Sequence, residues 1–235
     1  MITIRNAGKQ FQGRWIFRNL SLEIEAGDSV VLIGPSGGGK SVLLKTIAGL
    51  LSPDEGSIQV SSKNVGMLFQ KNALFDSLTV EENLLFPLRE IKKMTGQPAQ
   101  EKASRFLSQV GLAGCEKLFP DEISGGMQKR LGIARALIVE PEVILYDEPT
   151  AGLDPITSKT IAELIRKLMK ETRSTLLTVT NDMQRAYQIG NQIFLLANGK
   201  LTAGGTPHEV QSTDHPEIRQ FIYGLKLGPL TGGLA

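Results

Sequence analysis

Apolar residues recur at every second position near the N-terminus of this 235-residue chain, which predicts short strands at residues 2–4 and 20–24. Continuous apolar runs predict further strands at 29–33, 143–146 and 175–179, the first of them buried on both faces. The Asn198-Gly199 pair, which follows another apolar run, predicts a hairpin turn.

Helical periodicity fills most of the remaining chain. A helix is predicted over about 40–51, ending near Ser52-Pro53, and the whole segment from about 71 to 140 has helical character. Within that segment, one helix is predicted to start at a capping box formed by Thr79 and Glu82, and a second to run from Pro98 to an end at Gly111. A third helix is predicted to start after Ser124-Gly125-Gly126, and a fourth, beyond the segment, at Asp154-Pro155. Helices that alternate with buried strands predict an α/β fold with a mostly parallel sheet.

Composition narrows the class of protein. The 26 basic and 24 acidic residues leave a net charge of +2, so a broad nucleic-acid-binding surface is not expected. The single cysteine, Cys115, cannot form an internal disulfide and indicates a reducing compartment. The N-terminus lacks the pattern of a signal peptide, and no apolar run approaches the roughly 20 residues needed to span a bilayer.

The segment G-P-S-G-G-G-K-S at 34–41 matches the phosphate-binding loop pattern G-x-x-x-x-G-K-[ST], with a predicted strand before it and a predicted helix after it. Backbone N–H groups of such a loop curl around phosphate, and the lysine and serine suit the β- and γ-phosphates and Mg²⁺. A glycine-rich tight turn is the alternative, which the lysine, serine and flanking elements make weak. The residues expected to bind the nucleotide here are Gly34, Pro35, Ser36, Gly37, Gly38, Gly39, Lys40, Ser41 and Val42.

Two carboxylates follow the apolar run at 143–146. Side chains alternate along a strand, so Asp147 and Glu148 point in different directions and have different roles. Asp147 is expected to hold Mg²⁺, and Glu148 to orient or deprotonate the attacking water. The guanine-reading pattern N-K-x-D of GTPases is not present.

Together with these motifs, the segments I-S-G-G-M-Q at 123–128 and D-E-P-T-A-G-L-D at 147–154 resemble the nucleotide-binding subunit of ATP-binding cassette (ABC) transporters over nearly the whole chain. The resemblance implies one domain over 1–235 with a P-loop NTPase (RecA-like) core. It also implies an N-terminal antiparallel β subdomain, an inserted α-helical subdomain at about 71–140 and a C-terminal tail at about 212–235.

The family pattern also assigns roles. Two subunits sandwich ATP head to tail between the P-loop of one copy and the serine-glycine-glycine signature of the other. The resemblance places Ser124, Gly125, Gly126 and Met127 on the partner's ATP, and Asp154 in the loop that couples the two sites. Gln70 matches the glutamine that contacts Mg²⁺ and the attacking water, so the expected metal ligands are Ser41, Gln70 and Asp147. Phe11 best matches the aromatic residue that stacks on adenine; Trp15 is its rival, and core packing is the alternative for both.

Two positions depart from the family pattern. Met127 replaces the usual glutamine of the signature. Asn181 occupies the position of a histidine that contacts the γ-phosphate and the neighbourhood of Glu148, and asparagine can donate a hydrogen bond but cannot ionise. We therefore expect slow or differently gated hydrolysis.

Within the family, the signature run, the P-loop run to Lys45 and the tail at 218–229 are similar to the ATPase of Mla-type lipid-asymmetry transporters and their Mce relatives. This implies ATP-driven phospholipid transport between inner and outer membranes. The implied arrangement is a homodimer bound to membrane permeases at the cytoplasmic face of the inner membrane, with an Mce-domain substrate-binding protein. The tail is expected to clasp the dimer or dock a partner, or else to be a frayed terminus. The other readings are an ABC ATPase for a different cargo, or one that does not act in transport.

Overall fold

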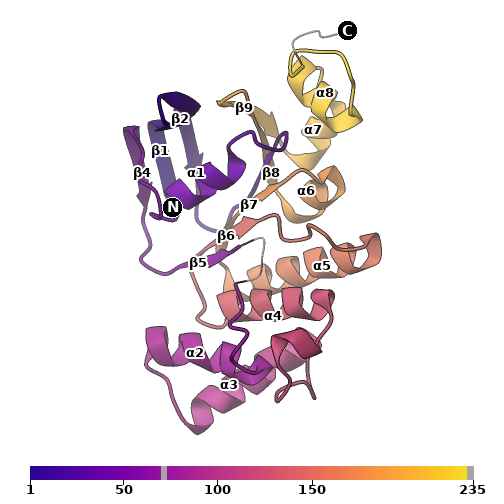
Figure 1. The fold of residues 1–235 in the computed structure, drawn as a ribbon. Coiled ribbons are helices and arrows are strands. Elements are labelled where there is room, and N and C mark those ends of the chain that lie inside the picture. The colour runs from indigo at the N-terminus through magenta and orange to yellow at the C-terminus, as the bar shows by residue number, and fades with distance from the viewer. Residues whose placement is uncertain (70–72, 232–235) are drawn as a thin grey trace. The chain divides into compact units, whose positions relative to one another are not determined.

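The structure is a computed structural model that describes residues 1–69 and 73–231. The chain divides into two compact units. The first unit comprises Met1–Lys63, Leu145–Glu148 and Thr175–Ala235, and the second comprises Asn64–Ile144 and Pro149–Ser174. Figure 1 traces both. Segments distant in the sequence therefore contribute to each unit.

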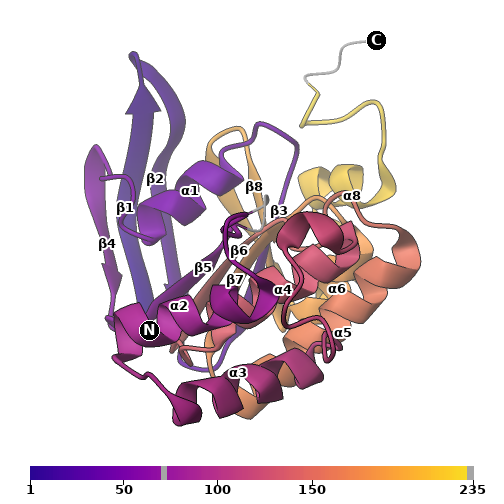
Figure 2. The ribbon, with the colours of Figure 1, turned by 60° about the horizontal axis from the view of Figure 1, so that its bottom comes forward.

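In the first unit, an antiparallel sheet has the strand order β2-β1-β4 and is visible in both Figures 1 and 2. Its strands are β1 (Ile2–Phe11), β2 (Arg14–Ile24) and β4 (Glu55–Val60). Strands at 2–4 and 20–24 are confirmed as parts of β1 and β2, but the expectation that they are short was wrong, because β1 has 10 residues and β2 has 11. Register shifts after Ile4 and Ala7 interrupt the strict alternation that would have revealed the full length.

The larger sheet has the strand order β5-β6-β7-β3-β8-β9. Its strands are β3 (Ser29–Ile33), β5 (Val65–Leu68), β6 (Val143–Asp147), β7 (Thr175–Thr180), β8 (Gln192–Ala197) and β9 (Lys200–Gly205). In the first unit, β3 pairs in parallel with β7 and β8, and every residue of β7 is buried. The predicted hairpin is confirmed: Asn198 and Gly199 have φ of 51° and 72° between β8 and the antiparallel β9.

Helix α1 (Lys40–Ile47) follows the glycine-rich segment. The predicted end at residue 51 was wrong, because the helix stops at Ile47. Gly49 has φ 74°, and the N–H groups of Gly49 and Leu50 donate to the carbonyl oxygens of Thr46 and Lys45. These two bonds form a Schellman motif, which turns the chain away from the helix before the apolar pattern ends.

The second unit contains the longer helices, which Figure 2 shows. They are α2 (Val80–Lys92), α3 (Gln97–Gln109), α4 (Gly125–Leu137) and α5 (Pro155–Thr172), with a short 3₁₀ turn η1 (Pro120–Glu122). The predicted capping box at Thr79 and Glu82 is confirmed at the start of α2. Gly111, with φ 67°, follows the end of α3 as predicted. Ser124 and Asp154 are the N-caps of α4 and α5.

Three short helices complete the first unit: α6 (Met183–Ile189), α7 (Pro207–Ser212) and α8 (Pro216–Tyr223). After α8, the buried Gln220 side chain binds the following segment. Its amide nitrogen donates to the carbonyl oxygen of Leu225 and to Thr231, and its amide oxygen accepts from the Leu230 N–H. Within 1–69 and 73–231, no helix combines the length and the apolar character that crossing a bilayer requires.

Candidate nucleotide-binding site

The glycine-rich segment at 34–39 leads from the end of β3 to the start of α1 in the first unit. Gly39 is the N-cap of α1, with φ 92°, a conformation that other residues rarely adopt. A Cβ atom at Gly34 would lie 2.1 Å from the carbonyl oxygen of Leu196, so only glycine lets the loop pass this close to β8. The loop therefore brings bare backbone to a helix start, where N–H groups and the helix dipole favour an anion.

Lys40 is the first residue of α1, and its side chain is buried. Its ammonium donates to the carbonyl oxygens of Gly34 (2.8 Å) and Pro35 (3.0 Å). Burial lowers the pKa of Lys40, while the carboxylates of Glu148 and Asp147 act in the opposite direction. The Lys40 ammonium therefore lies against the glycine loop, close to where the loop would hold an anion.

Ser41 and Asp147 come together although 106 positions separate them in the sequence. The Ser41 hydroxyl donates to Oδ1 of Asp147 at 2.8 Å. Asp147 is the last residue of β6 and is almost fully buried. A hydroxyl and a carboxylate in contact at the start of α1 form an all-oxygen pair, the donor type that Mg²⁺ prefers. Val42 follows them in the first turn of the helix.

Glu148 lies just after β6 and is half-buried. Its φ of 52° is unusual for a residue with a side chain. Its N–H donates to the carbonyl oxygen of Val179, and its carboxylate accepts the backbone N–H of Asn181. Burial raises the pKa of Glu148, opposed by the Lys40 charge and by the Asn181 hydrogen bond. A carboxyl shifted in this direction is a suitable proton acceptor for water.

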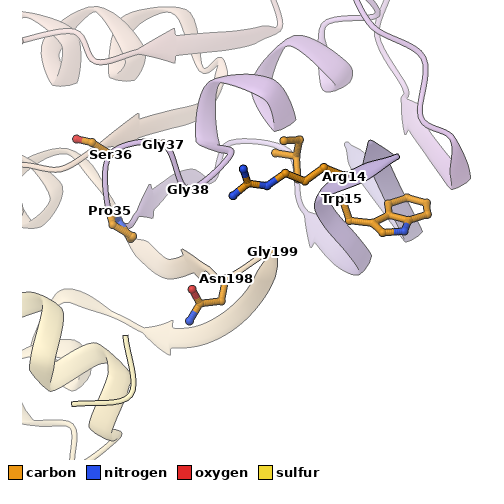
Figure 3. A pocket seen from close by; sticks show the side chains of 9 residues that line it. Arg14, Trp15, Pro35, Ser36, Gly37, Gly38, Asn198 and Gly199 are labelled. Atoms are coloured by element: carbon orange, nitrogen blue, oxygen red, sulfur yellow. The ribbon is translucent and has the colours of Figure 1, made fainter. Parts of the chain in front are cut away.

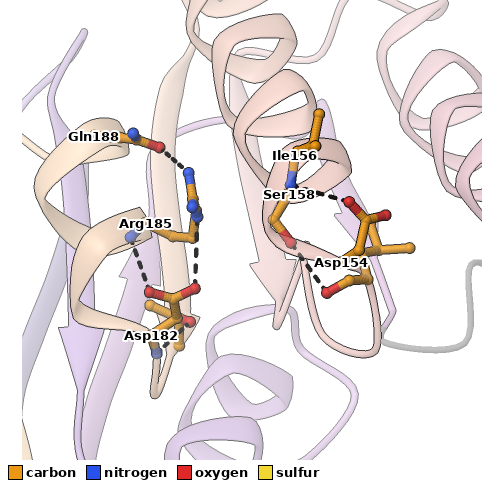
Figure 4. A network of polar contacts seen from close by, with 8 residues as sticks. Asp154, Ile156, Ser158, Asp182, Arg185 and Gln188 are labelled. Atoms are coloured by element: carbon orange, nitrogen blue, oxygen red, sulfur yellow. Dashed lines mark hydrogen bonds and ion pairs between the residues drawn. The ribbon is translucent and has the colours of Figure 1, made fainter.

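The loop that carries Asn181 is held by its neighbours in the first unit. The Asp182 N–H donates to the hydroxyl of Thr180, and the Asp182 carboxylate caps α6 by accepting the Arg185 N–H. Figure 4 shows the buried Arg185 guanidinium between Asp182, at 3.5 Å, and Gln188. Asn181 follows directly on β7, and its side chain is exposed.

The two aromatic candidates for adenine stacking have different surroundings. Phe11 is 44% exposed at the end of β1, with the Lys9 ammonium 5.4 Å from its ring centre. Trp15 borders a cavity of about 460 Å³ beside residues 35–38 of the glycine loop. In Figure 3, however, the indole points away from the loop. The Arg18 guanidinium also stacks on the indole, 4.6 Å from its ring centre. Phe11 is therefore the freer ring.

The signature segment starts α4 in the second unit. Ser124 caps the helix by accepting the Met127 N–H at 3.3 Å. Gly125 is exposed, and a Cβ atom at Gly126 would lie 3.1 Å from Thr157 of α5. The signature is therefore a helix start that is accessible at Ser124 and Gly125, where a ligand can closely approach the backbone.

Asp154 caps the next helix of the second unit. Its Oδ1 accepts the N–H groups of Ile156 and Thr157, each at 3.0 Å, as Figure 4 shows for Ile156. The hydrogen bonds from Thr157 are the main cause of a lowered Asp154 pKa. In this chain Asp154 therefore acts as the N-cap of α5.

The first unit thus brings together residues 34–42, Asp147, Glu148 and the Asn181 backbone, while Ser124–Met127 and Asp154 belong to the second unit. Gln70 lies outside the described residues. The sequence analysis assigned no role in the site to Arg14 or to Asn198, both of which border the cavity beside the glycine loop. The turn dipeptides Gln12-Gly13 and Asn198-Gly199 beside them were the available signal.

These features define a P-loop nucleotide-binding cassette. The glycine loop joins a parallel strand to a helix and carries a lysine and a serine. The serine is hydrogen-bonded to an aspartate at the end of another strand, and a glutamate follows that aspartate. Residues 17–151, more than half of the chain, match the family model described as ABC transporter. The chain belongs to the ABC transporter family. Within that family it is an ATP-binding and ATP-hydrolysing protein.

Curated relatives cover almost the whole chain. A probable ribonucleotide transport ATP-binding protein, mkl of Mycobacterium leprae, is 38% identical over 97% of this chain and 70% of its own length. The chloroplastic protein trigalactosyldiacylglycerol 3 of Arabidopsis thaliana is 38% identical over 98% of this chain and 75% of its own length. The intermembrane phospholipid transport system ATP-binding protein MlaF of Escherichia coli is 34% identical over 98% and 91%.

Solved structures give the same fold. A dimeric post-hydrolysis state of the ATP-binding cassette MJ0796, bound to ADP and Pi, aligns with a TM-score of 0.79 and 30% identity. The alignment covers 88% of this chain and 99% of that one. The P-loop NTPase fold, with a mostly parallel sheet and a separate antiparallel sheet, is therefore confirmed.

Proposed function

We propose that this chain is the ATPase subunit of a lipid transporter, using ATP and Mg²⁺ at a head-to-tail dimer interface to move phospholipid between inner and outer membranes. The observation that carries the nucleotide chemistry is the 2.8 Å contact of Ser41 with Asp147 at the foot of the glycine loop. The relatives named for phospholipid transport and for a galactolipid support the cargo.

The side chains suggest a division of labour in hydrolysis. Lys40 turns from the loop carbonyls to the β- and γ-phosphates. Ser41, Asp147 and Gln70 would hold Mg²⁺, which supplies Lewis-acid stabilisation of the phosphate charge. Glu148 takes the proton of the attacking water, and Asn181 donates a hydrogen bond near the γ-phosphate.

The second nucleotide-contacting surface would come from the other copy. Ser124, Gly125 and Gly126 form a helix start whose first two residues are exposed, which suits the γ-phosphate of an ATP held by a partner. Met127 contributes no polar group there, and Asp154 would contact the opposite subunit. ATP then stabilises the dimer, and hydrolysis removes that stabilisation.

The permease would bind in the second unit, whose helical part we place at about 71–140. A cavity of about 360 Å³ there is bordered by β5 and by Phe75, Ile91 and Arg135. Phe75 is 38% exposed and lies under the Arg135 guanidinium at 4.2 Å, while Ile91 is 61% exposed. Leu84 of α2, by contrast, is fully buried and belongs to the core of this unit. An apolar segment of a membrane permease fits this groove.

The proposed setting is the cytoplasmic face of the inner membrane, with the ATPase peripheral to its permease and an Mce-domain protein as the substrate-binding partner. The tail at 212–235 would clasp the dimer or dock a partner. Tyr223, Leu225 and Leu227 are each at least 50% exposed there, which supports a contact surface.

Purification from detergent-solubilised membranes tests the transport proposal. We expect a tagged chain to retain an integral permease and an Mce-domain protein, with phospholipid in the complex. The name of the mycobacterial relatives favours one competing cargo, a ribonucleotide. Stimulation of ATPase activity by ribonucleotide but not by phospholipid vesicles in the purified complex would select that cargo. Recovery of ribosomal proteins without a permease would refute transport.

Asn181→His is expected to raise the maximal ATPase rate several-fold in the assembled complex. Histidine can bond the γ-phosphate and carry charge, whereas asparagine contributes only a neutral hydrogen bond. The measurement is steady-state phosphate release with saturating ATP. Gln184→His, at an exposed position on α6, is the control and should leave turnover unchanged. Equal turnover of Asn181→His and wild type would contradict a rate-limiting role for this substitution.

A further inference from the structure

The cavity beside the glycine loop contains a cationic side chain that the motifs of the chain do not assign. The cavity, of about 460 Å³, is bordered by residues 14–16, by residues 35–38 and by Asn198-Gly199. In Figure 3 the guanidinium of Arg14 points toward Gly37 and Gly38 of the loop. All of these residues lie within the first unit.

A tight hairpin determines where Arg14 lies. Gln12 and Gly13 have φ of 50° and 78°, the combination of a type I′ turn between β1 and β2. Arg14 is the first residue after the turn and pairs directly with Phe11. Directly opposed residues of an antiparallel pair share one face of the sheet, so Arg14 lies on the face of Phe11.

Trp15 pairs with Gln10, one position further from the turn, and so lies on the opposite face. Its ring is occupied there: a Cβ atom at Gly8 would lie 2.8 Å from the indole, and Arg18 stacks on it. Arg18 is in turn held by two hydrogen bonds of 2.8 Å to Glu55. Among the hairpin residues that border the cavity, Arg14, Trp15 and Ile16, the charged side chain is therefore Arg14.

The charge around the cavity favours an anion. None of the described residues that border it is an aspartate or glutamate. Arg14 is exposed and makes no ion pair or side-chain hydrogen bond within residues 1–69 and 73–231, in contrast to Arg18. An unpaired guanidinium directed at backbone that cradles phosphate matches the geometry of phosphate recognition.

We propose that Arg14 binds the phosphate chain of the nucleotide, between the ring of Phe11 and the glycine loop. This inference rests on the proposed binding of ATP by that loop and adds a residue to it. A guanidinium donates two parallel hydrogen bonds to one phosphate group, which a lysine at the same position cannot reproduce. Arg14 thus contributes to nucleotide affinity.

Equilibrium binding to Arg14→Ala, Arg14→Lys and wild type tests this, with a non-hydrolysable ATP analogue and inorganic tripolyphosphate as probes. We expect Arg14→Ala to weaken both probes about ten- to a hundredfold, and Arg14→Lys to recover part of the loss. The matched control is Arg5→Ala, which removes an exposed arginine from β1 outside the cavity and should bind as wild type. Thermal unfolding verifies that each variant is folded.

Three results would overturn the proposal, and they differ from one another. Unchanged binding of both probes by Arg14→Ala, while Lys40→Ala weakens them, excludes Arg14 alone. A loss for the ATP analogue but not for tripolyphosphate places Arg14 on the base or ribose. Unchanged binding by Lys40→Ala would refute ATP binding by the loop and, with it, the role of Arg14.

Discussion

Replacing Glu148 with glutamine is expected to reduce ATP turnover by about two to four orders of magnitude while ATP binding is retained. Glutamine keeps the size of the side chain but cannot accept a proton from water. Burial raises the pKa of the half-buried Glu148 carboxyl, which favours it as a proton acceptor for water. Asp147, by contrast, is engaged with Ser41.

The second consequence of Glu148→Gln concerns assembly. If two copies close around ATP, blocked hydrolysis leaves the nucleotide in the interface, and we expect a dimer that persists in Mg²⁺ and ATP. Light scattering after gel filtration measures the mass, and phosphate release measures turnover. A variant that stays monomeric with ATP, both alone and in the membrane complex, would contradict the head-to-tail site.

Glu142→Gln is the matched control for this substitution. Glu142 is exposed, immediately precedes β6 and undergoes the same carboxylate-to-amide change at the opposite end of the strand from Glu148. We expect wild-type turnover and a nucleotide-dependent mass like that of wild type. If Glu142→Gln loses as much activity as Glu148→Gln, the loss comes from disturbing β6 and not from removing a proton acceptor for water.

The elements that could be predicted are those whose signals are local. The buried strands β3, β6 and β7 are continuous apolar runs, and the turn at Asn198-Gly199 follows from backbone conformations that few residues tolerate. The capping box of α2 uses two residues three positions apart. In each case the physical cause lies within a few residues of its effect.

Errors arose where a local pattern is interrupted or continues beyond the element. Bulges in β1 shift the pairing after Ile4 and Ala7, so alternation alone underestimated the strand. In α1 the apolar pattern continues past Ile47, but Gly49 in the left-handed conformation ends the helix. Pairing register and backbone handedness depend on tertiary context that periodicity does not encode.

The candidate site shows the same distinction. Residues 34–41 and 147–148 could be identified because their spacing follows from binding phosphate on a loop and charge at a strand end. The contact of Ser41 with Asp147 could be expected only through a motif, since it joins residues 106 positions apart. The direction of Arg14 depends on a two-residue turn and on which face its neighbours occupy. No residue pattern along a single strand predicts that.

Lys40→Ala is expected to weaken ATP binding by at least about a hundredfold, and therefore to abolish turnover at ATP concentrations that saturate wild type. The ammonium would make charge-assisted hydrogen bonds to two phosphate groups, and alanine makes neither. The effect differs from that of Glu148→Gln because binding itself is lost. Equilibrium binding of a non-hydrolysable ATP analogue, measured beside phosphate release, separates the two.

Folding must be controlled in this experiment, because Lys40 also bonds the carbonyl oxygens of Gly34 and Pro35. Removing a buried donor leaves those oxygens without it, at a cost of about 1–3 kcal/mol each in the free energy of unfolding. Lys45→Ala, an exposed lysine in the last turn of the same helix, is the matched control and should bind as wild type. If Lys40→Ala unfolds at the wild-type temperature and still binds the analogue normally, ATP binding by the glycine loop is refuted, because the one buried ammonium on that loop would then contribute nothing to nucleotide affinity.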